Sequence, residues 1–350
     1  MAKIHFEKIR SELAMLNPYN NFAEELHTVE VRKDPLLGDV SVYNPFLRDK
    51  AKFFFGENDS AFIEKLVGES AKTCIFCGER IGKSTAKYRS DLIPEGRMTT
   101  GEATLFANLF SVGKYHPVIS LSRAHFLKLS EFTPALLENG FQAAIKFLRL
   151  LYSHDPSSAL YATINANYLL PAGASLVHPH LQMLVTPVAY SYQARLIDAG
   201  RHYFEKNGSS YFSDLCNQEK EAGVRYITQK GGWHWMTAFS PMGMNEVMAV
   251  HETKHDIGLL SETDIRDLAF GISRVLAWYE SLGHLSFNYS LFSVRKSLEE
   301  EGFCCLLKMV TRQNLYPGYR NDDYFLQKML QSELIFTTPE ELALQLRGYF

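Results

Sequence analysis

Several features that would place a protein in a specialised class are missing from this sequence of 350 residues. No stretch approaches the roughly 18 consecutive apolar residues of a membrane-spanning helix, and the N-terminal segment lacks the apolar core of an export signal. Basic residues form no long block, and 36 of them against 39 acidic residues give a formal net charge of −3. These absences disfavour a membrane protein, an exported protein and a general nucleic-acid binder. We therefore expect a globular protein located in the cytoplasm.

Cysteine is also scarce, with five residues, an odd number in a chain of this length. Without an export signal, this disfavours a framework of disulfide bonds. Cys74 and Cys77 are separated by two residues, the spacing at which two thiolates bind one zinc ion. Redox-active pairs have the same spacing, and a redox protein sensitive to thiol oxidation remains an alternative. We expect the remaining cysteines, Cys216, Cys304 and Cys305, to be free thiols.

An internal repeat of about 125–130 residues organises the sequence. Each half has paired strands, a helix, a further strand and a closing strand in the same order. The first-half segments are 110–121, 135–154, 161–167 and 178–185, and the second-half segments are 239–250, 264–281, 285–290 and 303–310. The first of these helices follows Thr133 and Pro134, which suit an N-cap and a first helical position. The repeat predicts an α+β fold of two tandem halves, each an antiparallel sheet with a crossing helix.

The predicted organisation has three parts. Residues 1–30 form a helical lead-in, because Ile9, Leu13 and Leu16 fall on one face of a helix. The first half spans 31–190 and carries the chemistry, and the second half spans 191–350. Within the second half, residues 191–230 are polar with helical character and could be an insertion or a connector.

The pair His178 and His180 distinguishes the two halves. Residues two apart on a strand face the same side, so both imidazoles point into one site. Two partly buried histidines without a function are one interpretation, and a metal ligand beside a nucleophile is the other. The cysteine pair favours the second, because a closed zinc site needs two further ligands and His125 and His178 are available. Taken singly, His125 could equally be a surface histidine. The second half has no imidazole at the matching positions, which we align as Phe303, Cys304, Cys305 and Leu307.

The segment from Asn167 to Gln182 resembles the active-site strand of the galactose-1-phosphate uridylyltransferase (GalT) family, the transferase branch of the histidine-triad superfamily. That pattern is an asparagine followed by Gly-X-Ser-X-X-His-Pro-His-X-Gln, with the asparagine eleven residues before the first histidine, as here. Other segments are similar to family landmarks in the same order, so the resemblance covers roughly residues 30–345. These segments are 32–39 with Arg48 after it, the pair Cys74 and Cys77, 106–110, His125, 233–241 and 287–290.

The resemblance implies a ping-pong nucleotidyl transfer. His180 would attack the α-phosphorus of a nucleotide sugar or dinucleotide, and a phosphate acceptor would then cleave the covalent nucleotidyl-histidine. Gln182 and Ser175 would donate hydrogen bonds to the phosphoryl oxygens. The implied substrate-binding residues are Arg48, Asn108, Asn167, Gly173, Ser175 and Gln182. One structural zinc would be bound by Cys74, Cys77, His125 and His178, and the protein would be a homodimer.

Some positions depart from the family pattern. Leu109 replaces an acidic residue after Asn108, and the segment from Phe303 to Met309 has no histidine for a second metal. The transferred nucleotide and the acceptor therefore stay open. A phosphorylase that uses inorganic phosphate and an inactive, zinc-stabilised nucleotide-binding protein are alternatives. Gln182 stands where the hydrolase branch has a third histidine, which disfavours a hydrolase.

Overall fold

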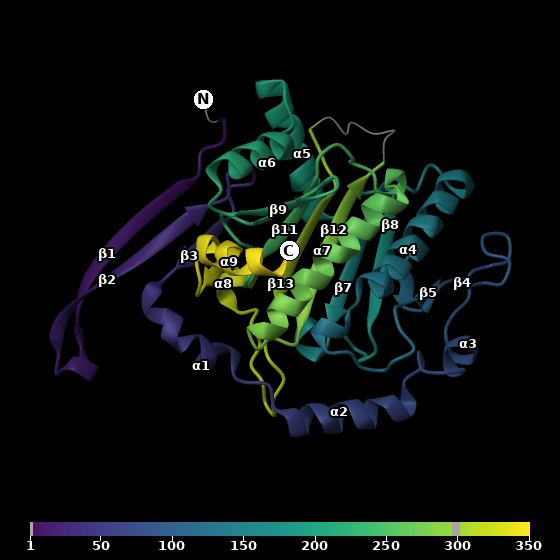
Figure 1. Ribbon diagram of the computed structural model, residues 1–350, viewed down its shortest axis with the longest axis horizontal. Helices are drawn as coiled ribbons and strands as arrows, with labels where there is room; N and C mark the ends of the chain where they lie inside the picture. The colour runs from purple at the N-terminus through teal and green to yellow at the C-terminus, as the bar shows by residue number, and fades with distance from the viewer. Residues whose placement is uncertain (1–2, 296–301) are drawn as a thin grey trace.

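The computed structural model describes residues 3–295 and 302–350 and has an α+β architecture with two sheets (Figure 1). A four-stranded sheet has the order β1-β2-β3-β14, and a ten-stranded sheet has the order β4-β5-β6-β8-β7-β12-β13-β11-β10-β9. The strands are β1 (Glu7–Asn17), β2 (Ala23–Lys33), β3 (Val40–Tyr43), β4 (Met98–Thr100), β5 (Ala103–Ala107), β6 (Pro117–Ser120), β7 (Tyr161–Tyr168), β8 (His180–Thr186), β9 (Tyr226–Lys230), β10 (Trp233–Thr237), β11 (Val247–His251), β12 (Phe287–Val294), β13 (Leu306–Thr311) and β14 (Ser332–Ile335). The helices are α1 (Ala51–Phe55), α2 (Ser60–Thr73), α3 (Arg80–Ser84), α4 (Pro134–His154), α5 (Ser191–Asn207), α6 (Tyr211–Ala222), α7 (Glu262–Ser281), α8 (Phe325–Lys328) and α9 (Pro339–Leu346).

The order of the ten-stranded sheet is the same from either edge toward the centre. On each side three consecutive antiparallel strands lie outermost, the closing strand comes next, and the strand that follows the long helix lies at the centre. The two central strands, β7 and β12, pair antiparallel from Tyr168↔Phe287 to Tyr161↔Val294. The predicted α+β class is therefore confirmed, with the sheets of the two halves joined into one. The boundary between the halves at residue 190 stays a prediction.

Helices α4 and α7 lie side by side across one face of this sheet (Figure 1). Helix α4 begins as predicted: Thr133 Oγ1 accepts a hydrogen bond from the Leu136 N–H, and Pro134 occupies the first turn. Helix α7 begins after Ser261, which forms a capping box with Asp264. The apolar faces of both helices are buried against the sheet and form the main core of the protein.

The other face of the sheet, called the open face below, is covered mainly at its ends. A small cluster around Phe76 and Val118 covers β5, β6 and β8, and helices α5 and α6 pack over β10 and β11. The helical character expected for 191–230 is thus confirmed for α5 and α6. Between these covers, directly opposed residues on neighbouring strands form a polar row, and such residues share one face. The row runs Gln182, Asn165, Ser290 and Lys308.

The alternation of side chains corrects our alignment of the two halves by one residue. Cys305 and Leu307 lie in the core beneath the helices, whereas Leu306 and Lys308 face the other side of β13. A shift of one residue moves a side chain to the opposite face, so Cys305 cannot be the counterpart of His180. The second half still presents no histidine on this part of the open face.

The predicted helical lead-in at residues 1–30 is wrong. Strands β1 and β2 form a long hairpin, paired from Glu7↔Lys33 to Asn17↔Ala23, that projects from the body of the molecule (Figure 1). Ile9 and Leu13 are four residues apart, a spacing that places two side chains on one face of a helix and of a strand alike. Only the position of Leu16 distinguishes a helix from a strand here. In a helix Leu16 would share the face of Ile9 and Leu13, whereas in β1 it lies on the opposite face.

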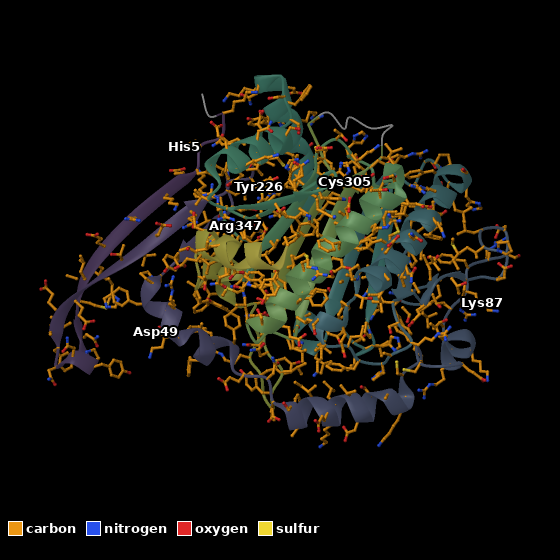
Figure 2. All side chains as sticks on the ribbon, in the orientation of Figure 1. His5, Asp49, Lys87, Tyr226, Cys305 and Arg347 are labelled. Atoms are coloured by element: carbon orange, nitrogen blue, oxygen red, sulfur yellow. The ribbon has the colours of Figure 1, made fainter. Side chains whose placement is uncertain are left out.

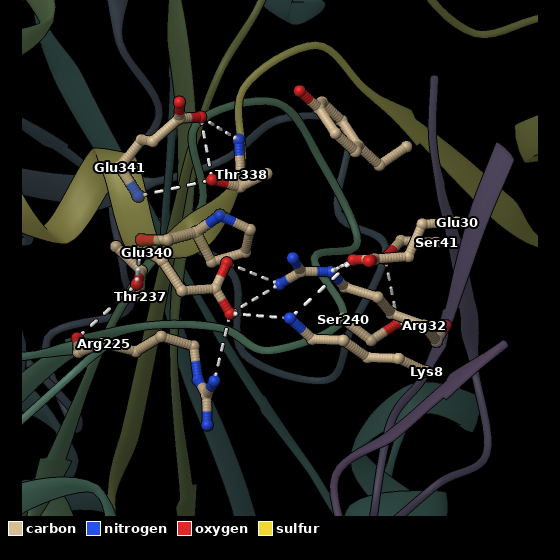
Figure 3. Close-up of polar contacts among 12 residues, drawn as sticks. Lys8, Glu30, Arg32, Ser41, Arg225, Thr237, Ser240, Thr338, Glu340 and Glu341 are labelled. Carbon is tan, nitrogen blue, oxygen red and sulfur yellow. Dashed lines mark hydrogen bonds and ion pairs between the residues drawn. The ribbon is translucent and has the colours of Figure 1, made fainter. Parts of the chain in front are cut away.

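Buried charges fix the base of the hairpin to the second half (Figure 3). Arg32 is 1% exposed; its Nε donates to Glu30 at 2.8 Å, and its Nη1 lies 2.8 Å from Glu340 on α9. Glu340 also forms an ion pair with Arg225, at 3.1 Å. Arg32 therefore helps to hold the β1–β2 hairpin against the second half of this chain. Among the helices in the described ranges, none combines the length and apolar character needed to cross a membrane.

Candidate active site and metal centre

The predicted metal ligands lie together beneath the first-half end of the open face. Helix α2 ends at Thr73 with Cys74 as its C-cap, and Gly78, with φ +55°, allows the chain to turn directly after Cys77. One ligand atom from each of Cys74, Cys77, His125 and His178 lies within 4.8 Å of the others. The structure thus confirms that these four residues form a group that could hold a metal ion.

The distances within this group fit a tetrahedral site. Cys77 Sγ lies 3.3 Å from the Nδ1 atoms of both histidines, and Cys74 Sγ lies 3.8 Å from His178 Nδ1. Two ligands of one tetrahedral zinc, at the usual Zn–S and Zn–N bond lengths, would be about 3.5 Å apart. Burial and the neighbouring Cys74 thiol raise the pKa of Cys77 to about 11, so a bound cation would be needed to hold Cys77 as a thiolate at neutral pH.

Hydrogen bonds on the far side of each ring leave Nδ1 free to bind a metal. His178 Nε2 donates to the Ser122 carbonyl at 2.8 Å, which places its ring proton on Nε2. His125 Nε2 lies 2.9 Å from Ser70 Oγ, whose own hydroxyl donates to the Leu66 carbonyl. Both rings are therefore held in the tautomer that a metal at Nδ1 requires.

His180 begins β8, and its ring is oriented in the opposite sense. Its Nδ1 donates to the carbonyl of His178 at 2.8 Å, so the lone pair is on Nε2. The ring of Phe76 packs edge-on against both histidines, with centroids 5.8 Å from His178 and 5.5 Å from His180. Burial lowers the pKa of His180 and outweighs the opposing bond to His178, which favours a neutral imidazole at pH 7.

A cavity of about 530 Å³ opens beside His180 on the open face. No aspartate or glutamate occurs among the described residues that line it. Its polar lining residues are Lys83, Ser84, Thr85, Asn108, Ser175, His180 and Gln182. Donor groups without competing carboxylates suit an anionic ligand such as a phosphate ester.

Two amide side chains predicted for the site, Gln182 and Asn167, have partners that fix their orientation, and Gln182 alone of the two is among the residues that line the cavity. Gln182 Oε1 lies 2.8 Å from Nε2 of His116, a histidine that is 5% exposed. Asn167 Oδ1 accepts a hydrogen bond at 2.7 Å from Asn288, whose own oxygen accepts one from Arg312 at 2.6 Å. In both amides the oxygen is engaged, which leaves the NH₂ group as the available donor.

Comparison with known proteins identifies a relative over almost the whole length. An uncharacterized protein of Archaeoglobus fulgidus is 30% identical over 325 residues, which are 92% of this chain and 93% of that protein. An ADP-glucose phosphorylase of Arabidopsis thaliana is 31% identical over 94 residues, 27% of this chain and 26% of that protein. No family model matches the sequence.

Similarity to solved structures identifies the fold. The ADP-glucose phosphorylase of Arabidopsis thaliana with bound ADP-glucose superposes with a TM-score of 0.68 at 18% identity, and a GalT-like protein of the same plant does so with a TM-score of 0.67 at 18% identity. A mutant uridylyltransferase superposes with a TM-score of 0.64 at 16% identity, and each alignment covers 91% of this chain and 98% of the other. The chain has the GalT-like fold and belongs to one family with the Archaeoglobus protein.

Not every residue predicted for the site lies beside the cavity of this GalT-like chain. Arg48, in the short 3₁₀ helix Pro45–Lys50, bonds to Glu341 at 2.6 Å. Its neighbour Asp49 lies on the opposite side of the molecule from Lys87, which follows the lining segment 83–86 (Figure 2). Gly173 adopts φ +85° at the end of the turn before Ser175, a conformation that favours glycine.

Sequence reasoning missed several polar residues in or behind this GalT-like site, among them Ser84, which lines the cavity. Lys83 and Thr85 also line the cavity, whereas His116 and Asn288 lie behind the two amides. Asn288 falls in the segment 287–290, which resembles a family landmark, but the resemblance assigned it no role. The contacts of His116 and Asn288 with the two amides are made between segments that are distant in sequence, so no local pattern indicates them. The only sequence signal for His116 is its place directly before Pro117, at the start of the strand beside β8.

Proposed function

We propose that this protein transfers a nucleoside monophosphate from a nucleotide sugar to the phosphate of a sugar 1-phosphate, with His180 as the residue that carries the nucleotide. The observation that best supports this is the state of the His180 ring. Its Nδ1–H is held by a backbone carbonyl, so its lone pair is on Nε2 beside a cavity whose described lining residues include no carboxylate. A positioned neutral imidazole is an effective nucleophile and a good leaving group.

The proposed reaction has two balanced steps. In the first, His180 Nε2 forms a bond to the α-phosphorus while the bond from that phosphorus to the bridging oxygen breaks, and a sugar 1-phosphate leaves. In the second, a phosphate oxygen of the acceptor attacks the same phosphorus, the P–N bond breaks, and the imidazole is regenerated. The half-buried Gln182 and the exposed Ser175 would donate hydrogen bonds to the phosphoryl oxygens. Asn108, Asn167 and Gly173 are proposed to contact the substrate.

We propose zinc for the Cys₂His₂ group, because two thiolates and two imidazoles are typical ligands of a closed, tetrahedral zinc site. Such an ion would have a structural role. His178 provides one ligand and also accepts the Nδ1–H of His180 with its carbonyl oxygen. Fixing His178 would thereby fix the ring that reacts.

Inorganic phosphate is the second candidate acceptor, which would make the protein a nucleotide-sugar or dinucleotide phosphorylase. The local match to an ADP-glucose phosphorylase favours this candidate. Both acceptors place a phosphate oxygen on the same phosphorus. The site residues described above therefore suit either reaction, and the product released from the protein distinguishes the two reactions.

Intact mass spectrometry tests the proposal. The protein is mixed with a panel of UDP-sugars, ADP-sugars and diadenosine polyphosphates, and then with either a sugar 1-phosphate or inorganic phosphate. We expect one nucleoside monophosphate to be added to the protein and then lost on addition of the acceptor. The added mass identifies the base, and the released product identifies the acceptor. Binding of nucleotide sugars without any adduct would instead indicate an inactive binding protein.

We also propose a homodimer. Arg48 does not line the cavity of its own chain, and its neighbour Asp49 lies on the opposite side of the molecule from Lys87, so a role for Arg48 at a phosphate would require a second copy (Figure 2). The hairpin β1–β2 exposes Ile9 and Leu13 on one face, at 49% and 62%. An isolated two-stranded hairpin is marginally stable, and a second copy would cover this face. Light scattering, which measures the mass in solution, tests this.

A further inference from the structure

The buried histidine His116 lies behind the amide of Gln182 and has a defined tautomer. The backbone N–H of Val112 donates to His116 Nδ1 at 3.2 Å. Because a backbone amide can only donate, Nδ1 must carry the lone pair, and the ring proton is on Nε2. That proton points at Gln182 Oε1, 2.8 Å away.

This bond determines which end of the Gln182 amide faces the cavity. An unconstrained glutamine could present either its oxygen or its NH₂ group, and only the NH₂ group can donate to a phosphoryl oxygen. The amide oxygen of Gln182 would instead repel the negative charge that develops on the phosphoryl oxygens in the transition state. With Nε2–H of His116 engaging the oxygen, the donor end is directed into the cavity.

We propose that His116 is a positioning residue for nucleotidyl transfer, and that it acts by holding Gln182 with its NH₂ group toward the transferred phosphoryl group. This rests on the proposed function of the His180 cavity. It assigns a role to a residue outside the histidine pair and the metal group. The contact with His116 also holds the half-buried Gln182 side chain in one orientation, so that its NH₂ group stays directed into the cavity.

The test is a double-mutant cycle measured by the rate of adduct formation on His180. His116→Phe keeps the ring and removes the donor, and we expect a loss of about 10- to 100-fold, typical for an orienting partner. His116→Gln replaces the donor and should recover most of the rate. In a Gln182→Ala background, itself slower by roughly 10²–10³-fold, His116→Phe should change the rate by less than about threefold.

His234 offers a matched control, because it is 6% exposed and bonds to Tyr226 in the second half. His234→Phe should leave the rate of adduct formation unchanged. Equal losses from His116→Phe in both backgrounds would overturn the inference, since a general structural effect is additive. Asn108 Nδ2 lies 3.2 Å from the same His116 nitrogen. A double-mutant cycle in which His116→Phe couples more strongly to a substitution of Asn108 than to Gln182→Ala would overturn the inference as well. Absence of an adduct in the wild-type protein refutes the proposed function itself and is recognised before any variant is made.

Discussion

Strands β8 and β13 occupy the same place in the two halves of one sheet but carry different chemistry. Each lies between a hairpin strand and a central strand. On the open face, β8 presents His180 and Gln182, whereas β13 presents Leu306 and Lys308. Lys308 forms a 2.8 Å ion pair with Glu246, which is completely buried. One strand therefore presents an imidazole lone pair and an amide donor at a cavity, and the other has its charge neutralised inside the protein.

The cavities beside the two strands differ in the same way. No acidic residue lines the described wall of the His180 cavity. The cavity of about 250 Å³ beside Lys308 is lined by Arg312, Asp322, Asp323 and Glu333, and Arg312 is already bound to Asp322. A shared strand order therefore does not require a shared function, because the side chains on the open face determine the chemistry of each half.

The largest effect is expected at His180. His180→Ala should abolish the covalent adduct while metal content and folding are retained, because His180 is not a metal ligand. Leu306→Ala is the control on β13. It should destabilise the protein by about 2–5 kcal/mol through a core cavity and leave adduct formation intact at a temperature where the variant is folded. Peptide mapping checks the site, and a nucleotide found on another residue would contradict the mechanism.

The second prediction concerns the metal group, which has no counterpart among the described residues of the second half. Cys74→Ser should remove the ion and lower stability by several kcal/mol, because structural zinc contributes folding free energy directly. Elemental analysis of protein purified without chelators should find about one zinc per chain, and none in the variant. Cys304→Ser, a buried cysteine before β13, is the control and should keep the metal. Wild-type protein without zinc would contradict the prediction.

The part of the site that the structure confirms is the group of possible metal ligands, which the spacing of Cys74 and Cys77 indicated. This cysteine pair forms a turn after one helix, and such a spacing determines geometry within a few residues. His178 precedes β8 and belongs to the metal group, whereas His180 begins β8 and lines the cavity. His116 and Gln182 are 66 residues apart, and their contact depends on the pairing of β6 with β8. No local pattern could indicate it.

The fold was predicted where burial imposes a pattern and missed where it does not. Helix α4 has a continuous apolar stripe against the sheet, and it was recognised by that stripe and its cap. Strand β1 is exposed along most of its length, so no buried face imposed a strand alternation on its sequence. The one-residue error at Cys305 has a related cause. Cys304 and Leu306, the two neighbours of Cys305, are both buried in one cluster on the open face, whereas Cys305 is buried in the core on the other face. Since all three residues are buried, hydrophobicity alone did not show which side chain lies on which face.

The third prediction tests whether Lys308 is purely structural. Lys308→Met leaves Glu246 buried without a partner charge and should destabilise the protein by about 3–5 kcal/mol. Adding Glu246→Gln removes the uncompensated charge and should restore much of that loss. Denaturant unfolding measures the stability, and both variants should form the His180 adduct at a normal rate when folded. A slower adduct in the double variant would show that the second half takes part in the chemistry.

The smallest effect is expected from Glu333, in the cavity beside Lys308. Burial raises the pKa of Glu333 to about 7 and outweighs its hydrogen bonds from Gln327 and Leu334. The folded protein therefore holds this proton more tightly than the unfolded chain. Its contribution to stability is complete below about pH 4.5 and is lost as the pH rises through 7.

Glu333→Gln keeps the shape and cannot ionise, so the difference in unfolding free energy between wild type and variant isolates this group. Relative to the variant, the wild type should lose about 1–3 kcal/mol between pH 4.5 and pH 7.5. Glu69→Gln, at an exposed position, is the control for the loss of one negative charge. A difference between wild type and Glu333→Gln that does not change with pH would show that the carboxyl group has the same pKa in the folded and the unfolded protein. The second-half cavity would then resemble an ordinary solvated surface rather than a buried acidic site.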